Sequence, residues 1–485
     1  MNELFNSYKN SDRNGRLLYV FLLTVSAFVL LAFLLSAFRS IVNADAGYYL
    51  GATELIREGY VPYRDFRLSY TPLFFYVLQV PRLMMGAFPD YTVYLLFLYI
   101  IAAFNAFLVY EIIYRIKRSV KFAWFSTLVF LLLYLYLEGT YFILETFSLC
   151  CGLAAMVLLV GKQASFWRCF LAGVCCAFAF LSKQYGLLFA GFVGVFLLLS
   201  DDGWKERILN CSYALAGFCA VLMAFICLFV LSGLGLNDLI SALSGSSYGG
   251  QSIGLYAEGV IKTLRLFPIL LFIPFVLFDK DNRGSNLAWA CCMGLFLASF
   301  QFYFNVFPHY YIYMLPFILV LNVMMWERLK SDKRTPVLYL LYFGILFTSC
   351  AIPTQSVYRN VKSLARHDLR AGQRETAIQL RQAAETYQLD SALCYWNTIQ
   401  YYGLCPIKPA AMEDYGFEFG SDTEDSYIKR LEKADCFILK GSDLGDIYEM
   451  KDLSSYLSER FELLDMQLED GTRVFVKKSG RDGTD

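Results

Sequence analysis

The sequence predicts a polytopic α-helical membrane protein with about eleven transmembrane helices and a small external α/β domain at its C-terminal end. Three observations lead to this fold class. The chain is 57% hydrophobic with a mean hydropathy of +0.47, above the range of soluble domains. Its apolar residues come in blocks close to the ~20 residues that cross a bilayer. The last part, 353–485, is instead polar and acidic, with 17 Lys and Arg against 23 Asp and Glu.

The first apolar block, 17–38, is longer than the apolar core of a signal peptide and has no small-residue cleavage site. It is therefore expected to remain as a membrane helix, and ten further blocks follow it. The predicted spans are 17–38, 91–114, 120–137, 141–160, 166–182, 185–200, 208–232, 263–278, 285–305, 308–326 and 335–352.

The positive charges predict the orientation of these spans. Alternate connections hold 17 of the 25 Lys and Arg residues before 353, and the short connections between them hold only Lys183, Lys262 and Arg265. Because cytoplasmic connections carry the excess of Lys and Arg, the N-terminus is expected in the cytoplasm. The chain is expected in the cell membrane, that is, the plasma or inner membrane. The loop 39–90 and the tail 353–485 are then expected on its outer side. The predicted domains are a transmembrane domain, 1–352, and an external domain, 353–485.

The tail is expected to form a small α/β domain. "TAIQLRQAAETYQ" has helical spacing, and "SALCYWN" and "ADCFILKG" are short apolar runs typical of buried strands. A hairpin that turns at Asp470-Gly471 is expected after them. Cys394 and Cys405 are predicted to be free thiols, since the first lies in a buried strand. A third external loop, 233–262, is rich in Gly and Ser and is expected to be mobile.

The first external loop is predicted to hold two interfacial helices joined by a charged turn. "AGYYLGATELIRE" carries one apolar face at helical spacing, which suits a helix on the membrane surface. A second segment is expected to start at Pro72, with Thr71 as its N-cap, and to stop at Gly86. Asp45 precedes the first helix and has two interpretations. It is either the N-cap of that helix or a carboxylate that faces a substrate at the membrane surface.

The same stretch resembles a known family. "DAGYYLGATELIREGYVPYRDF" and "TPLFFYVLQVPRLMMG" are similar to the first periplasmic loop of GT-C glycosyltransferases of the protein O-mannosyltransferase and aminoarabinose-transferase type. "LSKQYGL" (181–187), "FPHYYIYMLPFIL" (307–319) and "CYWNTIQYYGLCPIK" (394–408) resemble later stretches of that family. The matching residues of the first loop are Asp45, Gly47, Tyr49, Ala52, Gly59, Pro62, Tyr63, Asp65, Pro72 and Leu73. Ala46 stands where protein mannosyltransferases often have Glu, which favours a bacterial-type enzyme.

The resemblance implies a sugar donor on a polyprenyl phosphate and an acceptor in the cell envelope. The acceptor hydroxyl must lose a proton, so a carboxylate is expected as general base, and Asp45 is the candidate. The leaving phosphate needs cations and hydrogen-bond donors on the outer side of the membrane. Candidates for this role are Arg64, Arg67, Lys183, His309 and Tyr310.

Each of these residues also has a structural interpretation. Arg64 and Arg67 suit a solvated turn, Lys183 suits a side chain that extends to the interface, and His309 suits an interfacial histidine. Asp65 is expected to hold its turn through backbone amides. Glu145 is a candidate for binding sugar hydroxyls, and both it and Glu138 flank an outer turn. Tyrosines that suit either a sugar ring or an interfacial belt are Tyr48, Tyr49, Tyr310 and Tyr311.

The sequence has no DxD, Walker or GxGxxG motif with these residues, which disfavours a nucleotide-sugar donor, and nothing in it suggests nucleic acid. No obligatory cofactor is expected, and a divalent metal near the acids stays open. Two alternative functions remain. A transporter or flippase of lipid-linked glycans is disfavoured because no repeated halves are found. A glycan polymerase or ligase is disfavoured because the loop 233–262 holds only Lys262 as a cation.

Overall fold

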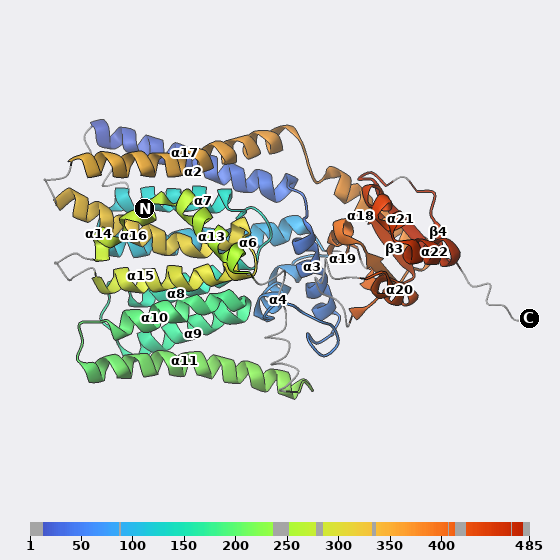
Figure 1. The fold of residues 1–485 in the computed structure, drawn as a ribbon, viewed down its shortest axis with the longest axis horizontal. Helices are drawn as coiled ribbons and strands as arrows, with labels where there is room; N and C mark the ends of the chain where they lie inside the picture. Colours follow the sequence, from blue (N-terminus) through green and yellow to red (C-terminus); the bar gives the residue numbers. More distant parts are fainter. Residues whose placement is uncertain are drawn as a thin grey trace, which may run out of the picture. The chain divides into compact units, whose positions relative to one another are not determined.

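The computed structural model describes residues 13–86, 89–235, 252–277, 285–331, 336–405, 407–412, 423–466 and 468–478. The chain forms two compact units. The first comprises Met1–Ser36, Leu98–Leu228 and Ser247–Ala365. The second comprises Ala37–Phe97, Phe229–Ser246 and Arg366–Asp485, so the first external loop and the tail belong to one unit. Figure 1 shows both units.

The first unit is a helical bundle, because long apolar runs without interruption favour helices whose backbone groups bond internally. Its helices, some of which continue beyond the limits of the unit, are α2 (Arg13–Arg39), α6 (Tyr91–Lys117), α7 (Val120–Tyr136), α8 (Glu145–Leu159), α9 (Phe166–Ser182), η1 (Gln184–Leu187), α10 (Leu188–Leu198), α11 (Trp204–Leu231), α13 (Ile253–Leu266), η2 (Pro268–Phe272), α14 (Ile273–Leu277), α15 (Ser285–Ser299), η3 (Phe300–Tyr303), η4 (Pro308–Met314), α16 (Leu315–Ser331) and α17 (Pro336–Arg366).

Small residues bring neighbouring helices of the bundle together, as in other membrane proteins. A Cβ atom on Gly173 of α9 would overlap the backbone of Ala214 in α11. A Cβ atom on Gly217 of α11 would in turn overlap the backbone of Phe170. These two glycines explain how α9 and α11 lie side by side (Figure 1).

Among the described residues, six helices are long and apolar enough to cross a membrane. They are Gly15–Arg39, Tyr91–Lys117, Trp204–Leu231, Asn286–Tyr303, Pro308–Trp326 and Leu340–Arg366. Four shorter apolar helices accompany them: Val120–Tyr136, Glu145–Leu159, Phe166–Ser182 and Gln184–Leu198. The chain is therefore a multi-pass membrane protein, as predicted, while the count of eleven spans stays a prediction.

Two boundaries differ from the sequence-based expectation. Most of the loop expected to be mobile, 236–251, lies outside the described residues, but its end is helical. Ser252 caps α13 by accepting a hydrogen bond from the Leu255 amide at 3.1 Å, so 253–262 is not an irregular connection. The last apolar helix, α17, runs past residue 352 to Arg366. The domain division at 352 stays a prediction.

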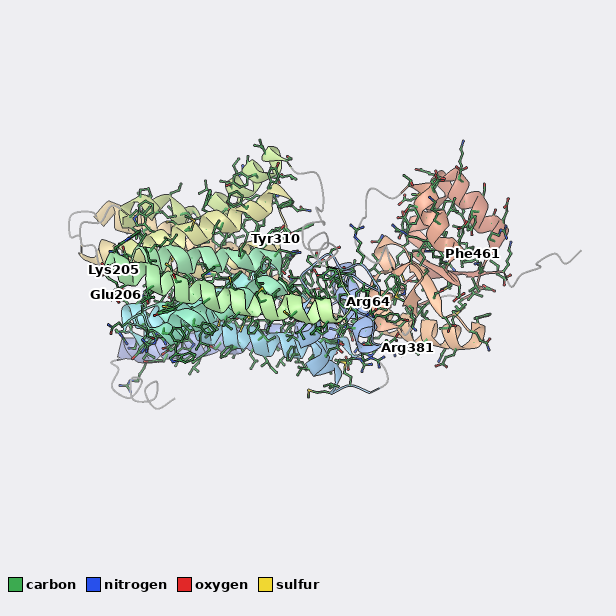
Figure 2. The ribbon with its side chains drawn as sticks, turned by 90° about the horizontal axis from the view of Figure 1, so that it is seen from below. Arg64, Lys205, Glu206, Tyr310, Arg381 and Phe461 are labelled. Atoms are coloured by element: carbon green, nitrogen blue, oxygen red, sulfur yellow. The ribbon has the colours of Figure 1, made fainter. Side chains whose placement is uncertain are left out.

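The two ends of the bundle differ in the residues they carry. Figure 2 shows Lys205 and Glu206 at one end of the first unit and Tyr310 at the opposite end. Lys205 belongs to the connections predicted to be cytoplasmic, and Tyr310 belongs to a segment predicted to be external. A residue of a connection predicted to be cytoplasmic and a residue of a segment predicted to be external thus lie at opposite ends of the bundle.

We expect impermeant thiol reagents to label Ser455→Cys in intact cells and Lys205→Cys only after permeabilisation, because Lys205 lies in a positive connection. Ser455 is an exposed position of the tail. The background chain would carry Ser in place of Cys219 and Cys227, the exposed native thiols in the described parts. The reverse labelling pattern would invert the predicted topology and place Asp45 in the cytoplasm.

The second unit combines short helices with a small sheet. Its elements are α3 (Ala44–Arg57), α4 (Leu73–Val77), α5 (Gln79–Arg82), α18 (Ala371–Tyr387), β1 (Ser391–Cys394), η5 (Trp396–Thr398), α19 (Gln400–Leu404), β2 (Lys408–Pro409), α20 (Glu424–Glu432), β3 (Cys436–Lys440), η7 (Gly441–Asp443), α21 (Leu444–Glu449), α22 (Lys451–Arg460), β4 (Phe461–Leu463) and β5 (Thr472–Lys477). The expected second loop helix begins one residue late, at Leu73. Its N-cap position is Pro72, which forms no side-chain cap, and Thr71 is fully buried.

The sheet has the strand order β2-β1-β3-β5-β4. β1 pairs in parallel with β2 and β3, and β5 pairs antiparallel with β3 and β4. The predicted strands and the β4–β5 hairpin are confirmed, with Gly471 in a left-handed turn (φ 78°) before β5. One face packs on α20, α21 and α22 through a core that includes Leu431, Phe437 and Leu457. Cys394 and Cys405 are buried free thiols, as predicted.

Candidate functional site

Asp45 lies in the first turn of α3, in the second unit, and is half-buried. The cap of this helix is Asn43, whose side-chain oxygen accepts a hydrogen bond from the Ala46 amide at 2.9 Å. The interpretation of Asp45 as the N-cap is therefore wrong by two residues. Asn and Asp are equally good caps, so the pattern alone did not distinguish them. An acidic group in the first turn is still stabilised by the helix dipole.

The tyrosines after Asp45 form a packed aromatic group. Tyr48 and Tyr49 are 2% and 3% exposed and contact the Tyr70 ring edge-on, at centroid distances of 6.2 and 5.5 Å. The Tyr48 hydroxyl accepts a hydrogen bond from the Ser69 amide at 3.0 Å. Burial raises the pKa of Tyr48 to about 12. These rings hold α3 against the rest of the loop, so they are not surface tyrosines.

The charged turn is held by Asp65, as predicted. Its carboxylate accepts a hydrogen bond from the Val61 amide at 2.7 Å and pairs with Arg64 at 2.8 Å. The hydrogen bond from Arg64 holds the pKa of Asp65 below its ordinary value. Arg64, labelled in Figure 2, also donates to the Ser232 carbonyl at 2.7 Å. The turn thus already uses both side chains, while Arg67 is half-buried and its amide donates to the Met412 carbonyl at 3.0 Å.

The first unit contains a charged cluster made from four separate segments, with a buried ion pair at its centre. Glu145 is the first residue of α8 and is 1% exposed, and it forms an ion pair with Lys183, which is 2% exposed. His309 lies with Nε2 3.6 Å from the Glu145 carboxylate and Nδ1 2.8 Å from the Glu138 carboxylate. We call Glu138, Glu145, Lys183 and His309 the charged cluster.

Local backbone geometry places each member of the cluster. Lys183 has an extended backbone (φ −158°) between α9 and η1, which ends α9 at Ser182. Gly186 follows because a Cβ atom there would overlap the Ala179 carbonyl oxygen. Glu138 adopts a left-handed conformation (φ 67°), which is costly for a residue other than glycine. Such strain is found more often at functional positions than elsewhere.

Aromatic rings complete the surroundings of the lysine. The Lys183 ammonium lies 5.2 Å from the centroid of the Tyr310 ring and 5.9 Å from that of Tyr185, within the range of a cation–π contact. Burial excludes the interpretation in which Lys183 extends to the interface. The cluster has two carboxylates and one lysine, so it keeps a net negative charge while His309 is neutral. An anion that bound Lys183 would have to compete with Glu145.

Three polar residues that the sequence analysis did not single out form hydrogen bonds beside the cluster. The Asn105 amide donates to the Thr146 carbonyl at 2.9 Å, and the Tyr134 hydroxyl bonds the Thr146 hydroxyl at 2.6 Å. The Gln301 amide donates to the Tyr310 carbonyl at 2.8 Å. Asn105 and Gln301 are 0% and 1% exposed. The available signal was a polar side chain inside a predicted membrane span, which is rare without a specific role.

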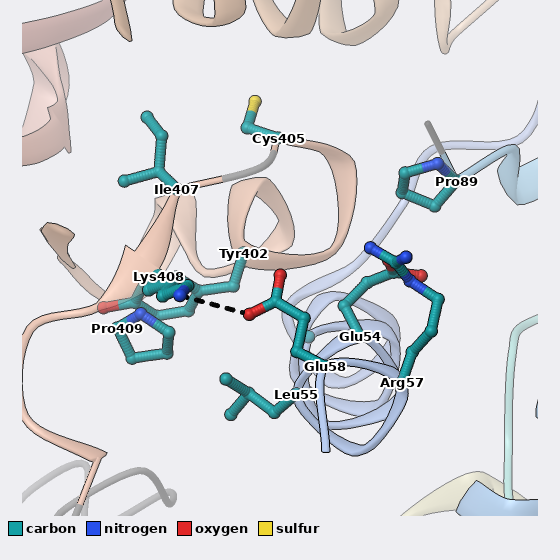
Figure 3. Close-up of a pocket in the computed structure, with 11 residues that line it drawn as sticks. Glu54, Leu55, Arg57, Glu58, Pro89, Tyr402, Cys405, Ile407, Lys408 and Pro409 are labelled. Carbon is teal, nitrogen blue, oxygen red and sulfur yellow. Dashed lines mark hydrogen bonds and ion pairs between the residues drawn. The ribbon is translucent and has the colours of Figure 1, made fainter. Parts of the chain in front are cut away.

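The far end of α3 borders a hollow in the second unit (Figure 3). Glu58, the C-cap of α3, pairs with Lys408 at 3.3 Å across it. Glu54 is held by Arg57 at 2.9 Å and by Arg82 at 2.5 Å. Ion pairs therefore engage both carboxylates that line this hollow. In the described ranges, no group of three or more His, Cys, Asp or Glu residues is arranged to hold a metal ion. The divalent metal that the sequence left open stays a prediction.

No family model and no curated protein matches the sequence. Solved structures do match the fold. ArnT from Cupriavidus metallidurans, bound to undecaprenyl phosphate, aligns with a TM-score of 0.63 at 14% identity over 96% of this chain and 99% of that chain. The oligosaccharyltransferase of Archaeoglobus fulgidus aligns with a TM-score of 0.54 at 10% identity over 94% of this chain and 75% of that chain. The chain therefore has the GT-C fold that the resemblance of its first loop predicted.

Proposed function

We propose that this chain is an inverting membrane glycosyltransferase that moves a sugar, a hexose or a pentose, from a polyprenyl-phosphate donor to an acceptor of the cell envelope on the outer face. The observation that carries the proposal is the match of nearly the whole chain to a GT-C structure that holds undecaprenyl phosphate. Two features of the chain support it: a carboxylate that suits a general base, Asp45, and a buried cation that suits a phosphate, Lys183.

In the proposed reaction, the acceptor hydroxyl attacks the anomeric carbon while the bond from that carbon to the phosphate oxygen breaks. The hydroxyl proton passes to Asp45, and the polyprenyl phosphate leaves with the bonding electron pair. A single displacement inverts the anomeric configuration. Asp45 suits the role of base because Asn43 performs the capping of α3. The acceptor is a lipid, a glycan or a protein.

Lys183 is proposed to stabilise the charge of the leaving phosphate. A cation in a water-poor environment stabilises an anion far more than the same cation in water. Lys183 has this environment, and its partner Glu145 has a second neighbour in His309 at 3.6 Å. His309 therefore stays beside the Glu145 carboxylate when Lys183 turns toward a phosphate. Glu145 is then also available for sugar hydroxyls, as the sequence analysis suggested.

The remaining candidates have unequal support. Tyr310 packs beside Lys183 and is proposed to line the phosphate site. Arg64 and Asp65 are proposed to shape the donor site through their turn, since they contact each other, Val61 and Ser232. Arg67 stays a candidate for the phosphate. The proposed location is the inner (plasma) membrane, with a cytoplasmic N-terminus and an external tail, and no cofactor is required.

The most selective test of this proposal is to measure which class of sugar donor the protein uses. The purified protein in nanodiscs, supplied with envelope membranes as acceptor, should transfer radiolabelled sugar from undecaprenyl phosphate. It should not use the same sugar on undecaprenyl diphosphate or on a nucleotide. Transfer from the diphosphate alone would favour a polymerase or ligase. Movement of the intact lipid-linked sugar between leaflets, without transfer, would favour a flippase.

A further inference from the structure

The segment that carries Asp45 is held by residues of the tail. Gln373 of α18 forms two hydrogen bonds with Val42, which lies 331 positions earlier. Its side-chain oxygen accepts from the Val42 amide at 2.8 Å, and its amide donates to the Val42 carbonyl at 3.0 Å. Both backbone groups of Val42 are therefore satisfied by one side chain. Val42 directly precedes Asn43, the cap of the helix that contains Asp45.

Arg370 fixes the chain just before this point. Arg370 is buried, at 2% exposed, and its guanidinium donates to the carbonyl oxygens of Ala37 and Ser40, each at 2.7 Å. These carbonyls belong to the end of α2, where a cation is favoured by the helix dipole. Arg370 also donates to the Thr92 hydroxyl at 3.0 Å. The backbone of the segment 37–42 is thus held at Ala37, Ser40 and Val42 by side chains at the start of α18.

The tail also contacts α3 itself. Figure 1 shows α19 beside α3, and the two helices pack closely although they are far apart in the sequence. A Cβ atom on Gly47 would overlap the backbone of Gln400. A Cβ atom on Gly403 of α19 would lie 2.5 Å from the Cβ atom of Leu50. Gly47 therefore has a structural reason to follow Asp45 by two positions: it allows α19 to approach.

A buried polar group anchors α19 in the tail. The Tyr401 hydroxyl donates to the Asp470 carboxylate, which also pairs with Lys440 of β3. The Asp470 amide donates to the Thr376 hydroxyl of α18 at 3.1 Å. Burial opposes ionisation of Asp470, but the hydrogen bonds from Lys440, Thr472 and Tyr401 outweigh it and lower its pKa. The position of α19 is therefore tied to both α18 and the sheet.

We propose that the tail is a positioning element for the general base. In this view Arg370, Gln373 and α19 set the place of Asp45, and none of them touches the substrate. The proposal rests on the proposed function in one respect, namely that Asp45 takes the proton. A displacement of a catalytic group by about 1 Å can cost about 10²-fold in rate, so contacts that fix α3 are expected to act on turnover.

Two pairs of matched variants in the full-length protein test this proposal. Gln373→Met removes both bonds to Val42, and Gln379→Met makes the same change further along α18, where the side-chain oxygen accepts no hydrogen bond. Gly403→Ala places a methyl group against α3. Gly445→Ala makes the same change in α21, where a Cβ atom meets nothing within 4 Å.

Two readouts are needed: hydrogen exchange of the 44–57 amides, and turnover at saturating donor. We expect Gln373→Met and Gly403→Ala to speed exchange of α3 by about tenfold or more, and to lower kcat by about tenfold with the donor KM unchanged. Gln379→Met and Gly445→Ala should change neither. A general loss of folding would instead speed exchange throughout the tail.

Unchanged exchange of α3 in both test variants would overturn the idea that the tail holds the helix. Faster exchange with normal kcat would show that the tail holds α3 without positioning the base, and would overturn the proposal as well. If the wild-type protein transfers no sugar from a polyprenyl phosphate, the proposed function fails. In that case the exchange data still decide whether the tail holds α3.

Discussion

Asp45→Asn is expected to lower sugar transfer by about 10²-fold or more while the protein still folds and inserts. The amide has the size of the carboxylate but cannot take the proton of the acceptor hydroxyl. Stability should be almost unchanged, because the structural cap of α3 is Asn43, which this variant keeps. Steady-state transfer and thermal unfolding of the same preparation measure the two effects.

Asn43→Ala is the matched control for Asp45→Asn. It removes the cap and should cost about 1 kcal/mol of stability, with a smaller effect on turnover, since the carboxylate remains. If Asp45→Asn turned over near the wild-type rate, Asp45 would not be the base. The base would then be sought at Asp65, Glu138 or Glu145. Each of these carboxylates has a partner in the structure. Asp65 contacts Val61 and Arg64, Glu138 contacts His309, and Glu145 pairs with Lys183.

Lys183→Met is expected to have the second large effect, on both stability and donor use. The change leaves Glu145 buried without its lysine, and breaking a buried ion pair in this way typically costs about 3–5 kcal/mol. Transfer should fall by about 10²-fold or more, because no cation remains for the phosphate. Lys183→Arg keeps the charge and should retain much more activity. Thermal unfolding and the donor kcat/KM measure these effects.

The double variant Lys183→Met with Glu145→Gln separates the two roles of the lysine. It removes both charges of the pair, so most of the lost stability should return. Donor use should stay low, because the site still has no cation. If the double variant recovered transfer along with stability, Lys183 would be only the counter-ion of Glu145.

Much of the fold could be predicted because the signals are local. Apolar blocks of membrane length marked the membrane helices. In the tail, apolar residues at helical spacing marked a helix, and short apolar runs marked the buried strands. Two errors have different causes. The cap of α3 was misplaced because Asn43 and Asp45 are equally suitable caps. The described end of the Gly/Ser-rich loop was expected to be irregular, but it is helical from Ile253 because Ser252 caps it. Gly and Ser weaken a helix but do not prevent one.

The arrangement of the site was harder to predict than its members. Lys183, Glu145 and His309 stood out because each is ionisable and lies at the end of an apolar segment. Their pairing did not follow from the sequence, since the spacing of Glu145 from Lys183 and of Glu138 from His309 in the chain says nothing about distance in space. The contacts of Arg370 and Gln373 with residues before Asp45 also join parts of the chain 330 or more positions apart. Such contacts depend on tertiary packing, which a single sequence does not record.

Release of the lipid carrier shows whether Asp45 is the base of a single-displacement sugar transfer from a polyprenyl phosphate. Wild-type protein and Asp45→Asn would be incubated with a panel of undecaprenyl-phosphate hexoses and pentoses and with envelope membranes, and free undecaprenyl phosphate would be measured by mass spectrometry. We expect the wild type to release undecaprenyl phosphate from at least one donor, in step with labelled acceptor of inverted configuration. Asp45→Asn should release it about 10²-fold more slowly. Equal release by both proteins, or transfer with retained configuration, would contradict this expectation.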